Sequence, residues 1–95
     1  MKTISIKLTG AIAQVVGEKV VTLELDDNAT YAAMIQKLAN LFPGLIGMII
    51  DIDGKTMLSS NMFLVNGQDF VMHGMWNQTP NDGDSLLLVS PITGG

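Results

Sequence analysis

Hydrophobic and polar residues alternate in two segments near the start of the chain. Residues 2–8 place an apolar side chain at every second position, and residues 19–25 repeat the same two-residue period. This period is typical of strands that bury one face and leave the other in water. The short apolar run 11–16 between them is flanked by polar residues and glycines, and it is compatible with a helical turn. The pattern predicts a hairpin of two strands with a long connection.

Apolar side chains recur at intervals of four, three and four residues in the segment 31–42. This spacing places them on one stripe of a helix that faces a core. Asn28 or Thr30 can cap the helix, because either side chain can accept a hydrogen bond from an unpaired amide of the first turn. Pro43 and Gly44 then end the helix. The predicted stripe consists of Tyr31, Ile35, Leu38 and Phe42, flanked by Met34 and Leu41.

The second half of the chain contains four further apolar runs. The run around Ile50 and Ile52 predicts a strand that ends at an Asp-Gly turn. Asn66-Gly67 lies between two apolar runs, and this dipeptide favours a tight hairpin turn because both residues tolerate a positive φ. The apolar run within residues 85–90 predicts a strand that is buried on both faces in the middle of a sheet.

The predicted elements follow one another without an internal repeat and without a linker long enough to separate domains. We therefore expect one α+β domain over residues 1–95, in which one main helix packs across a mixed sheet of about four to five strands. Pro91 ends the last strand, since it lacks the amide that a sheet ladder needs. Residues 90–95 then form a flexible C-terminal tail.

Composition narrows the classes of protein that fit. Apolar residues make up 47% of the 95 residues and charged residues 15%, so the chain should fold without help. The net charge is −4, and the basic residues are five scattered lysines, which argues against nucleic acid as a partner. The sequence has no apolar run of about 18 residues and does not begin like a signal peptide. We expect no membrane span and a cytoplasmic location.

Side chains that could carry catalysis or hold a metal are few. Cysteine is absent, which excludes disulfides, thiolate metal sites and cysteine nucleophiles. The single histidine, His73, has only Asp69 as an acidic neighbour within a few residues. Asp51 and Asp53 resemble part of a calcium loop, but the required first and twelfth carboxylates are missing. No phosphate-binding glycine motif or nucleophile elbow occurs, so we expect no metal, no cofactor and no enzymatic activity of the chain itself.

Met75 and Trp76 lie in a segment that glycine, asparagine and proline mark as a loop. Apolar side chains in such a loop either form an exposed spot for a partner or cover the end of the core. The sequence leaves both interpretations open, and the two residues are a candidate partner interface.

The last two residues, Gly94 and Gly95, can bury nothing because neither has a side chain. Glycine at both positions would let an extended backbone thread a narrow channel in another protein. The carboxylate of Gly95 could react there after activation with ATP. A terminus that is simply frayed is the alternative. The predicted threading segment consists of Pro91, Ile92, Thr93 and Gly94.

Four motifs together resemble the ubiquitin-like sulfur-carrier family, which includes MoaD and ThiS. They are KLTG at 7–10, LANLFPGL at 38–45, FLVNGQD at 63–69 and NDGDSLLLVSPITGG at 81–95. These motifs extend over nearly the whole chain, and the last is the most specific because it joins a turn, an apolar strand, a proline and the di-glycine. The resemblance is closest to MoaD, the small subunit of molybdopterin synthase.

The resemblance implies a β-grasp (ubiquitin-like) fold and a protein co-substrate rather than an enzyme. An adenylyltransferase of the ubiquitin-activating type (MoeB or ThiF type) would use ATP to adenylate Gly95, and sulfur transfer would convert the adenylate to a thiocarboxylate. Gly94 would keep the tail narrow enough for the tunnel of the large molybdopterin-synthase subunit. The sulfur would there build molybdopterin or tungstopterin, the organic part of the molybdenum cofactor or its tungsten counterpart.

Other functions remain open. Gly95 could form an isopeptide bond to target lysines, as in a ubiquitin-like protein modifier, or the sulfur could serve thiamine or another pathway. The third alternative is an interaction module that uses the sheet or the region of Met75 and Trp76 and never activates its tail.

Overall fold

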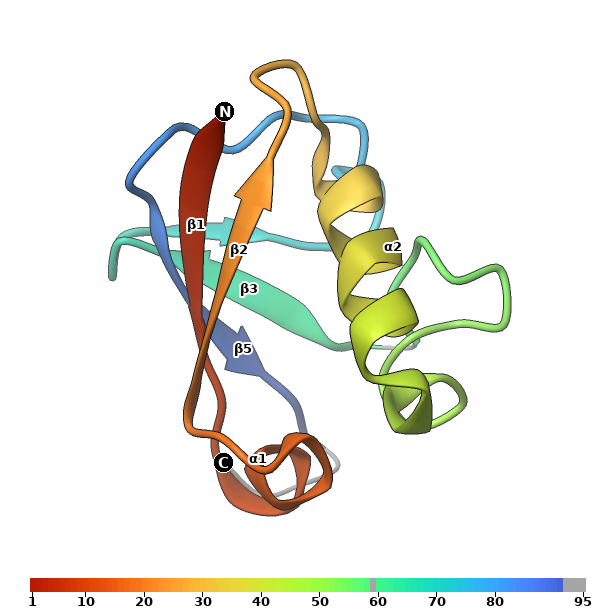
Figure 1. Cartoon of the computed structure of the whole chain (residues 1–95). Helices are drawn as coiled ribbons and strands as arrows, with labels where there is room; N and C mark the ends of the chain where they lie inside the picture. The colour runs from red at the N-terminus through yellow and green to blue at the C-terminus, as the bar shows by residue number, and fades with distance from the viewer. Residues whose placement is uncertain (59, 92–95) are drawn as a thin grey trace.

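The computed structural model describes residues 1–58 and 60–91 of the chain. This part forms one mixed sheet with helices against it (Figure 1). Neither of its α-helices has the length and apolar character needed to cross a membrane. In chain order the elements are β1 (Lys2–Lys7), α1 (Gly10–Val16), β2 (Val20–Leu25), α2 (Tyr31–Leu41), a 3-10 turn (Pro43–Leu45), β3 (Met62–Val65), β4 (Asp69–Val71) and β5 (Ser85–Val89).

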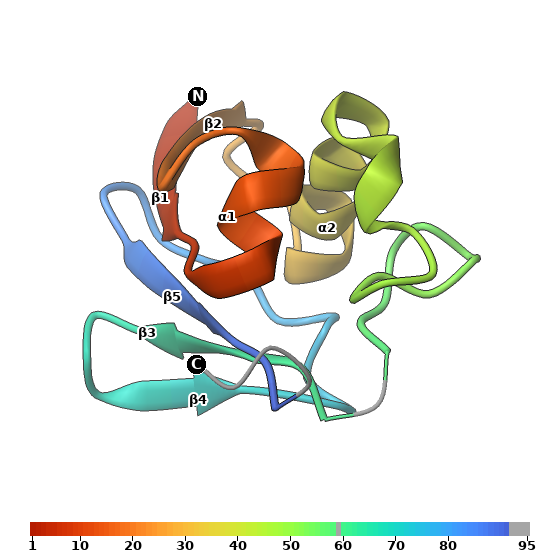
Figure 2. The same ribbon diagram turned by 90° about the horizontal axis from the view of Figure 1, so that it is seen from below.

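The sheet has the strand order β2-β1-β5-β3-β4. β1 pairs antiparallel with β2 and parallel with β5, while β3 pairs antiparallel with both β5 and β4. The last strand along the chain therefore lies in the middle of the sheet, as predicted. α2 crosses one face of the sheet (Figure 1). α1 follows β1 and lies at the end of the sheet where β1 ends (Figure 1, Figure 2). The predicted α+β architecture, with one main helix across a mixed sheet, is confirmed.

α2 begins and ends where the sequence predicts. The Thr30 side chain accepts a hydrogen bond at 3.2 Å from the amide of Ala33, which makes Thr30 the cap. The Phe42 amide donates to the Leu38 carbonyl at 2.9 Å, and Pro43 then starts the 3-10 turn. The helix buries one stripe against the sheet, formed by Tyr31, Met34, Ile35, Leu38 and Ala39.

The core lies between α2 and the sheet. Alternate side chains of β1, β2, β3 and β5 are buried there. This confirms the two-residue period predicted for residues 2–8 and 19–25. Phe63 on β3 is fully buried, and its ring meets the Trp76 ring edge-on with the centroids 6.1 Å apart. Such an aromatic pair contributes about 0.5–1.5 kcal/mol beyond the burial of its area.

The face of the sheet opposite α2 differs from the sequence-based expectation. Leu87 and Val89 on β5 point to this face and are only half-buried. The strand is central within the sheet, but only its core side is fully covered. A continuous apolar run indicates a central strand, but it does not indicate whether a second layer of structure covers the other face of the sheet.

The segment around Ile50 and Ile52 is not a strand, so that prediction is wrong. Ile50 forms only isolated bridges with Ile46 and Met57, and Ile52 is 87% exposed. The physical reason is the side chain of Asp53, whose Oδ1 accepts hydrogen bonds from two following backbone amides at 2.9 and 3.0 Å. These local bonds stabilise a turn that competes with a sheet ladder.

Lys2 is buried although it carries a charge. It is 3% exposed, and its Nζ donates to the carbonyl oxygens of Ala29 and Pro80, both at 2.8 Å. These charge-assisted bonds satisfy the ammonium group away from water. They also join β1 to the segments that precede α2 and β5, so the start of β1 is held from two sides.

Candidate functional site

β5 leads the C-terminal segment out of the centre of the sheet. It pairs with β1 on one side and with β3 on the other. Ser90, which the sequence assigns to the flexible tail, is buried at 3% exposed, whereas Pro91 is exposed. The described part of the tail therefore begins at Pro91. The predicted attachment residue and the rest of the threading segment lie outside the described residues: Ile92, Thr93, Gly94 and Gly95.

A buried polar residue lies next to the end of β5. The register places Asn61 beside Ser90, because Met62 pairs with Val89. Asn61 is 1% exposed, and its backbone and side-chain nitrogens both donate to the Leu58 carbonyl. Its side-chain oxygen is buried without a partner in the described part of the chain. The C-terminal segment thus leaves the sheet next to a buried polar residue, Asn61, at the edge of the apolar core.

An apolar surface occupies the face of the sheet opposite α2. Leu64 lies opposite Leu87 on β5 and opposite Phe70 on β4, so three strands contribute to one row. Phe70 is 46% exposed and Met72 is 39% exposed. The other members are half-buried between their strand neighbours. We call this surface the open-face patch, and it consists of Met62, Leu64, Phe70, Met72, Leu87 and Val89.

A hollow of ≈ 420 Å³ adjoins the open-face patch. Lys7 borders it and pairs with Leu87 across β1 and β5, so a cation lies beside the apolar surface. The patch includes side chains of β5 itself, which means that a partner holding the tail can also contact the patch. Sequence reasoning did not identify this surface. The sequence signal is the lack of polar residues in 62–65 and 86–89, because a continuous apolar run places apolar side chains on both faces of β3 and β5.

Met75 and Trp76 do not form an exposed apolar spot. Trp76 is 6% exposed and Met75 is half-buried against the core. The Trp76 carbonyl accepts a hydrogen bond from the Ala32 amide at 2.9 Å, which ties this loop to the first turn of α2. The Trp76 ring fills the space beside Phe63, so it covers the end of the core. Of the two interpretations that the sequence leaves open, the structure favours cover of the core for the Trp76 ring.

A polar pocket lies between the start of α2, the β3–β4 hairpin and the loop before β5. Its volume is ≈ 440 Å³, and Tyr31, Asp69 and Asp84 contribute to its lining. Asn66 holds the hairpin against this loop, because its side-chain nitrogen donates to Asp84 Oδ1 at 3.0 Å and its side-chain oxygen accepts from the Ser85 amide at 2.9 Å. The sequence gives no sign of this pocket, since its polar residues are far apart along the chain.

The Tyr31 phenol provides a pH-dependent test of the pocket. Burial, and then the negative charges of Asp84 and Asp69, raise the pKa of Tyr31 above its ordinary value of 10.0. The stability that this phenol contributes is fully present below its unfolded pKa and is lost as the pH rises through its folded pKa. From about pH 9 to about pH 11, we expect the free energy of unfolding to fall more steeply for the wild type than for Y31F. Urea denaturation at each pH measures both slopes, and equal slopes would contradict this assignment.

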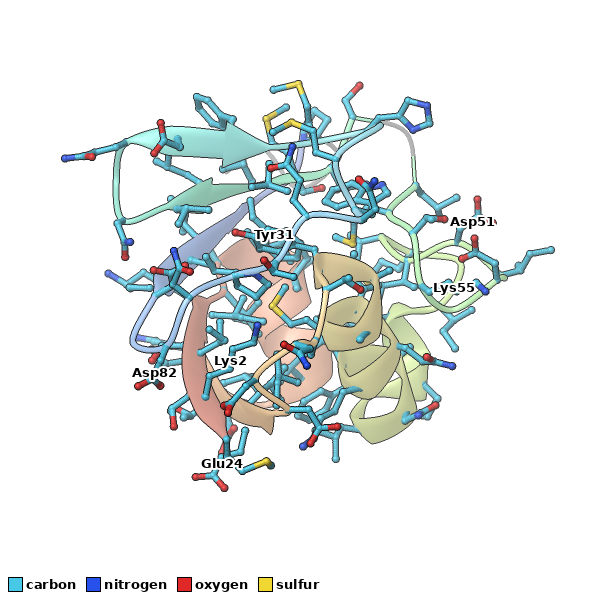
Figure 3. The ribbon with its side chains drawn as sticks, turned by 90° about the horizontal axis from the view of Figure 1, so that it is seen from above. Lys2, Glu24, Tyr31, Asp51, Lys55 and Asp82 are labelled. Atoms are coloured by element: carbon cyan, nitrogen blue, oxygen red, sulfur yellow. The ribbon has the colours of Figure 1, made fainter. Side chains whose placement is uncertain are left out.

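The described residues contain no group of three histidine or acidic side chains that could hold a metal ion. His73 is exposed. The amide of Lys55 and the hydroxyl of Thr56 donate to the Asp53 carboxylate at 2.9 and 2.8 Å, and these bonds hold the pKa of Asp53 below its usual range. Asp51 lies in the same loop and accepts from a backbone amide (Figure 3). Both carboxylates therefore stabilise a turn.

Comparison with known protein families matches residues 6–95 to the ThiS family. The chain belongs to the ThiS family. This ThiS-family protein is 28% identical over 92 residues to small archaeal modifier protein 3 of Haloferax volcanii, a match that covers 97% of the chain and 98% of the relative. Among solved structures it is similar to SAMP1 from Haloferax volcanii, with a TM-score of 0.79, 26% identity, and 98% and 99% of the two chains covered.

A putative molybdopterin converting factor, subunit 1, from Pyrococcus furiosus shares the fold of this ThiS-family protein. The TM-score is 0.69 at 20% identity, and the match covers 93% of this chain and 95% of the other. These likenesses confirm the ubiquitin-like β-grasp fold. Family membership makes the protein a ubiquitin-like small protein of the sulfur-carrier and modifier type.

Proposed function

We propose that this protein is a sulfur carrier whose Gly95 is converted to a thiocarboxylate that donates sulfur in molybdopterin or tungstopterin synthesis. The observation that carries the proposal is the match of the ThiS family up to residue 95, with the di-glycine included. The position of β5 supports it, because a strand held on both sides leads to an exposed Pro91. A rigid strand would thus present a tail whose last two residues have no side chain.

The carboxylate of Gly95 needs activation, because a carboxylate is a poor electrophile. An adenylyltransferase of the ubiquitin-activating type would bind the protein with ATP, and a Gly95 oxygen would attack the α-phosphorus with pyrophosphate as the leaving group. A sulfur atom at the oxidation level of sulfide would then attack the acyl carbon and displace AMP. The net change replaces one carboxylate oxygen by sulfur. The threading segment with Gly94 would carry this group into an acceptor enzyme, here the large subunit of molybdopterin synthase.

A second function, protein modification, is favoured by the relatives. The two Haloferax volcanii proteins at 28% and 26% identity are named as modifiers, whereas the converting-factor subunit is 20% identical. The same acyl adenylate would then be attacked by the ε-amine of a target lysine, which forms an isopeptide bond and releases AMP. Both functions require the activation of Gly95, and they differ in the nucleophile that follows.

Intact-mass spectrometry tests the proposed function directly. The purified protein is incubated with an adenylyltransferase of the MoeB or ThiF type from the same genome, with ATP and with a sulfur donor. A sulfur carrier gains the mass difference between sulfur and oxygen. A modifier instead produces, in cell extracts, a ladder of larger species that resists reducing agents. No mass gain with an enzyme that forms the adenylate would overturn the sulfur-carrier proposal.

Phe70→Ser is expected to lower kcat/KM of the activating enzyme about tenfold while the protein stays folded. Burial of a Phe side chain in an interface contributes about 1.5–3 kcal/mol, and Phe70 is the most exposed member of the open-face patch. Pyrophosphate release measures the rate. The control is Ile52→Ser, which removes an 87% exposed apolar side chain from a loop outside the patch. Equal rates for the two variants would exclude the patch as the surface that this enzyme binds.

A further inference from the structure

The polar pocket is held in shape by hydrogen bonds between the three segments that form it. The Tyr31 amide donates to the Gln78 carbonyl at 2.9 Å, which joins α2 to the loop before β5. The Asn81 amide donates to Asp84 Oδ2 at 2.9 Å within that loop, and Asn66 joins the hairpin to Asp84. The volume of ≈ 440 Å³ lies within the range of small-ligand sites, roughly 300–1,000 Å³. The pocket is therefore formed before any ligand enters.

The pocket contains two carboxylates and no cation of its own. Asp84 is 8% exposed, and each of its oxygens accepts one hydrogen bond, which leaves lone pairs for a further donor. Asp69 supplies the second carboxylate, and none of the described residues that line the pocket is basic. Because a buried carboxylate is stabilised by a paired positive charge, this lining favours a cationic ligand.

The side chain of Tyr31 adds a third polar group to the lining of the pocket. Tyr31 is 4% exposed, and its hydroxyl makes no hydrogen bond with residues 1–58 and 60–91. The side chain extends from the start of α2 toward the β3–β4 hairpin, on the side where the pocket lies (Figure 3). The hydroxyl oxygen therefore has free lone pairs and can accept an N–H bond from a cation that enters the pocket.

We propose that this pocket receives a lysine or arginine side chain of a partner protein. The carboxylates and the Tyr31 hydroxyl would bind the charged head, while Val65, Phe70 and Val71 would contact the aliphatic stem. Phe70 lines the pocket and also belongs to the open-face patch, so a protein that covers the patch reaches the pocket. The net charge of −4 attracts a basic partner. The proposal rests on the proposed function only for the identity of this partner.

The test is a titration of the ¹⁵N-labelled full chain, followed by backbone amide shifts. The probes are N-acetyl-lysine-N′-methylamide, its arginine counterpart and, as the uncharged control, its norleucine counterpart. Saturable shifts are expected at the amides around Asp69 and Asp84 with the two basic probes only. Y31F should weaken binding about tenfold, and D69N about two- to fivefold. The control D26N removes an exposed charge outside the pocket and should leave the affinity unchanged.

Several outcomes would overturn the proposal. Equal shifts with the norleucine probe, or shifts centred on Asp26 and Asp27, would show unspecific contact. Saturation by Ca²⁺ without any response to the basic probes would make the pocket a metal site, and saturation by spermidine alone would make it a small-molecule site. The titration contains neither enzyme nor ATP. A failed sulfur transfer would therefore overturn the proposed function alone, while a failed titration would overturn this pocket assignment alone.

Discussion

Deletion of Gly95 is expected to lower thiocarboxylate formation at least about a hundredfold and to leave the free energy of unfolding within about 0.5 kcal/mol of the parent. The deletion moves the terminal carboxylate back by about 3.3 Å of extended chain. A displacement of about 1 Å at a reacting group can already cost a hundredfold in rate. Stability should persist because glycine has no side chain to bury and, among the described residues, the buried apolar side chains of the core lie between Ile4 and Leu88.

Intact mass after incubation with enzyme, ATP and sulfur donor measures the first effect, and urea denaturation measures the second. The matched variant is Gly95→Ala, which keeps the chain length and the carboxylate but adds one methyl group. It should react faster than the deletion variant and more slowly than the parent. A deletion variant that gains sulfur at the parental rate would show that the terminal carboxylate of Gly95 is not the reacting group.

The elements that could be predicted from the sequence are those with an unambiguous local signal. A period of two in residues 2–8 and 19–25 identifies strands because the pleat repeats every second residue. The turn at Asn66-Gly67 is confirmed, since both residues adopt a positive φ, +53° and +70°. The helix is confirmed because the stripe and the cap at Thr30 agree. In these segments local preference and tertiary structure favour the same conformation.

The wrong prediction around Ile50 and Ile52 and the open choice at Trp76 have one physical cause, because competing interactions do not appear in the hydrophobic pattern. Ile50 and Ile52 have the spacing of a strand, but the side chain of Asp53 supplies alternative hydrogen-bond acceptors for the backbone. Trp76 lies in a segment with loop composition, yet Phe63 provides a surface on which its ring is buried. Which of two preferences prevails depends on contacts between residues distant in sequence.

One part of the candidate site could be predicted from the sequence, and two parts could not. The tail can be read from the sequence because its chemistry depends on consecutive residues. The open-face patch depends on the register that places Leu64 opposite both Phe70 and Leu87. The polar pocket depends on the approach of Tyr31 to Asp84, which are separated along the chain by most of α2, the 3-10 turn and two strands. No local pattern encodes these contacts, so the structure was needed to find both surfaces.

Replacement of Phe63 by alanine is expected to lower the free energy of unfolding by about 3–5 kcal/mol. Phe63 is fully buried and loses both its own contacts and the edge-on pair with the Trp76 ring. Domains of this size are stable by about 5–15 kcal/mol, so the variant would approach the limit of folding. Phe63 also pairs with Leu88 on β5 and with Val71 on β4. The loss should therefore loosen the strand that leads to the tail.

Phe70→Ala is the matched control, because it makes the same chemical change on the neighbouring strand but on the exposed face. Phe70 is 46% exposed, so its truncation should cost less than about 1 kcal/mol. Urea denaturation followed by far-ultraviolet circular dichroism measures both variants, and Trp76 fluorescence reports separately on the ring that contacts Phe63. Equal losses for the two variants would contradict the placement of Phe63 in the core and of Phe70 outside it. A large loss for Phe63→Ala alone would show that the core face of the β3–β4 hairpin carries its stability and that the open face is not needed for it.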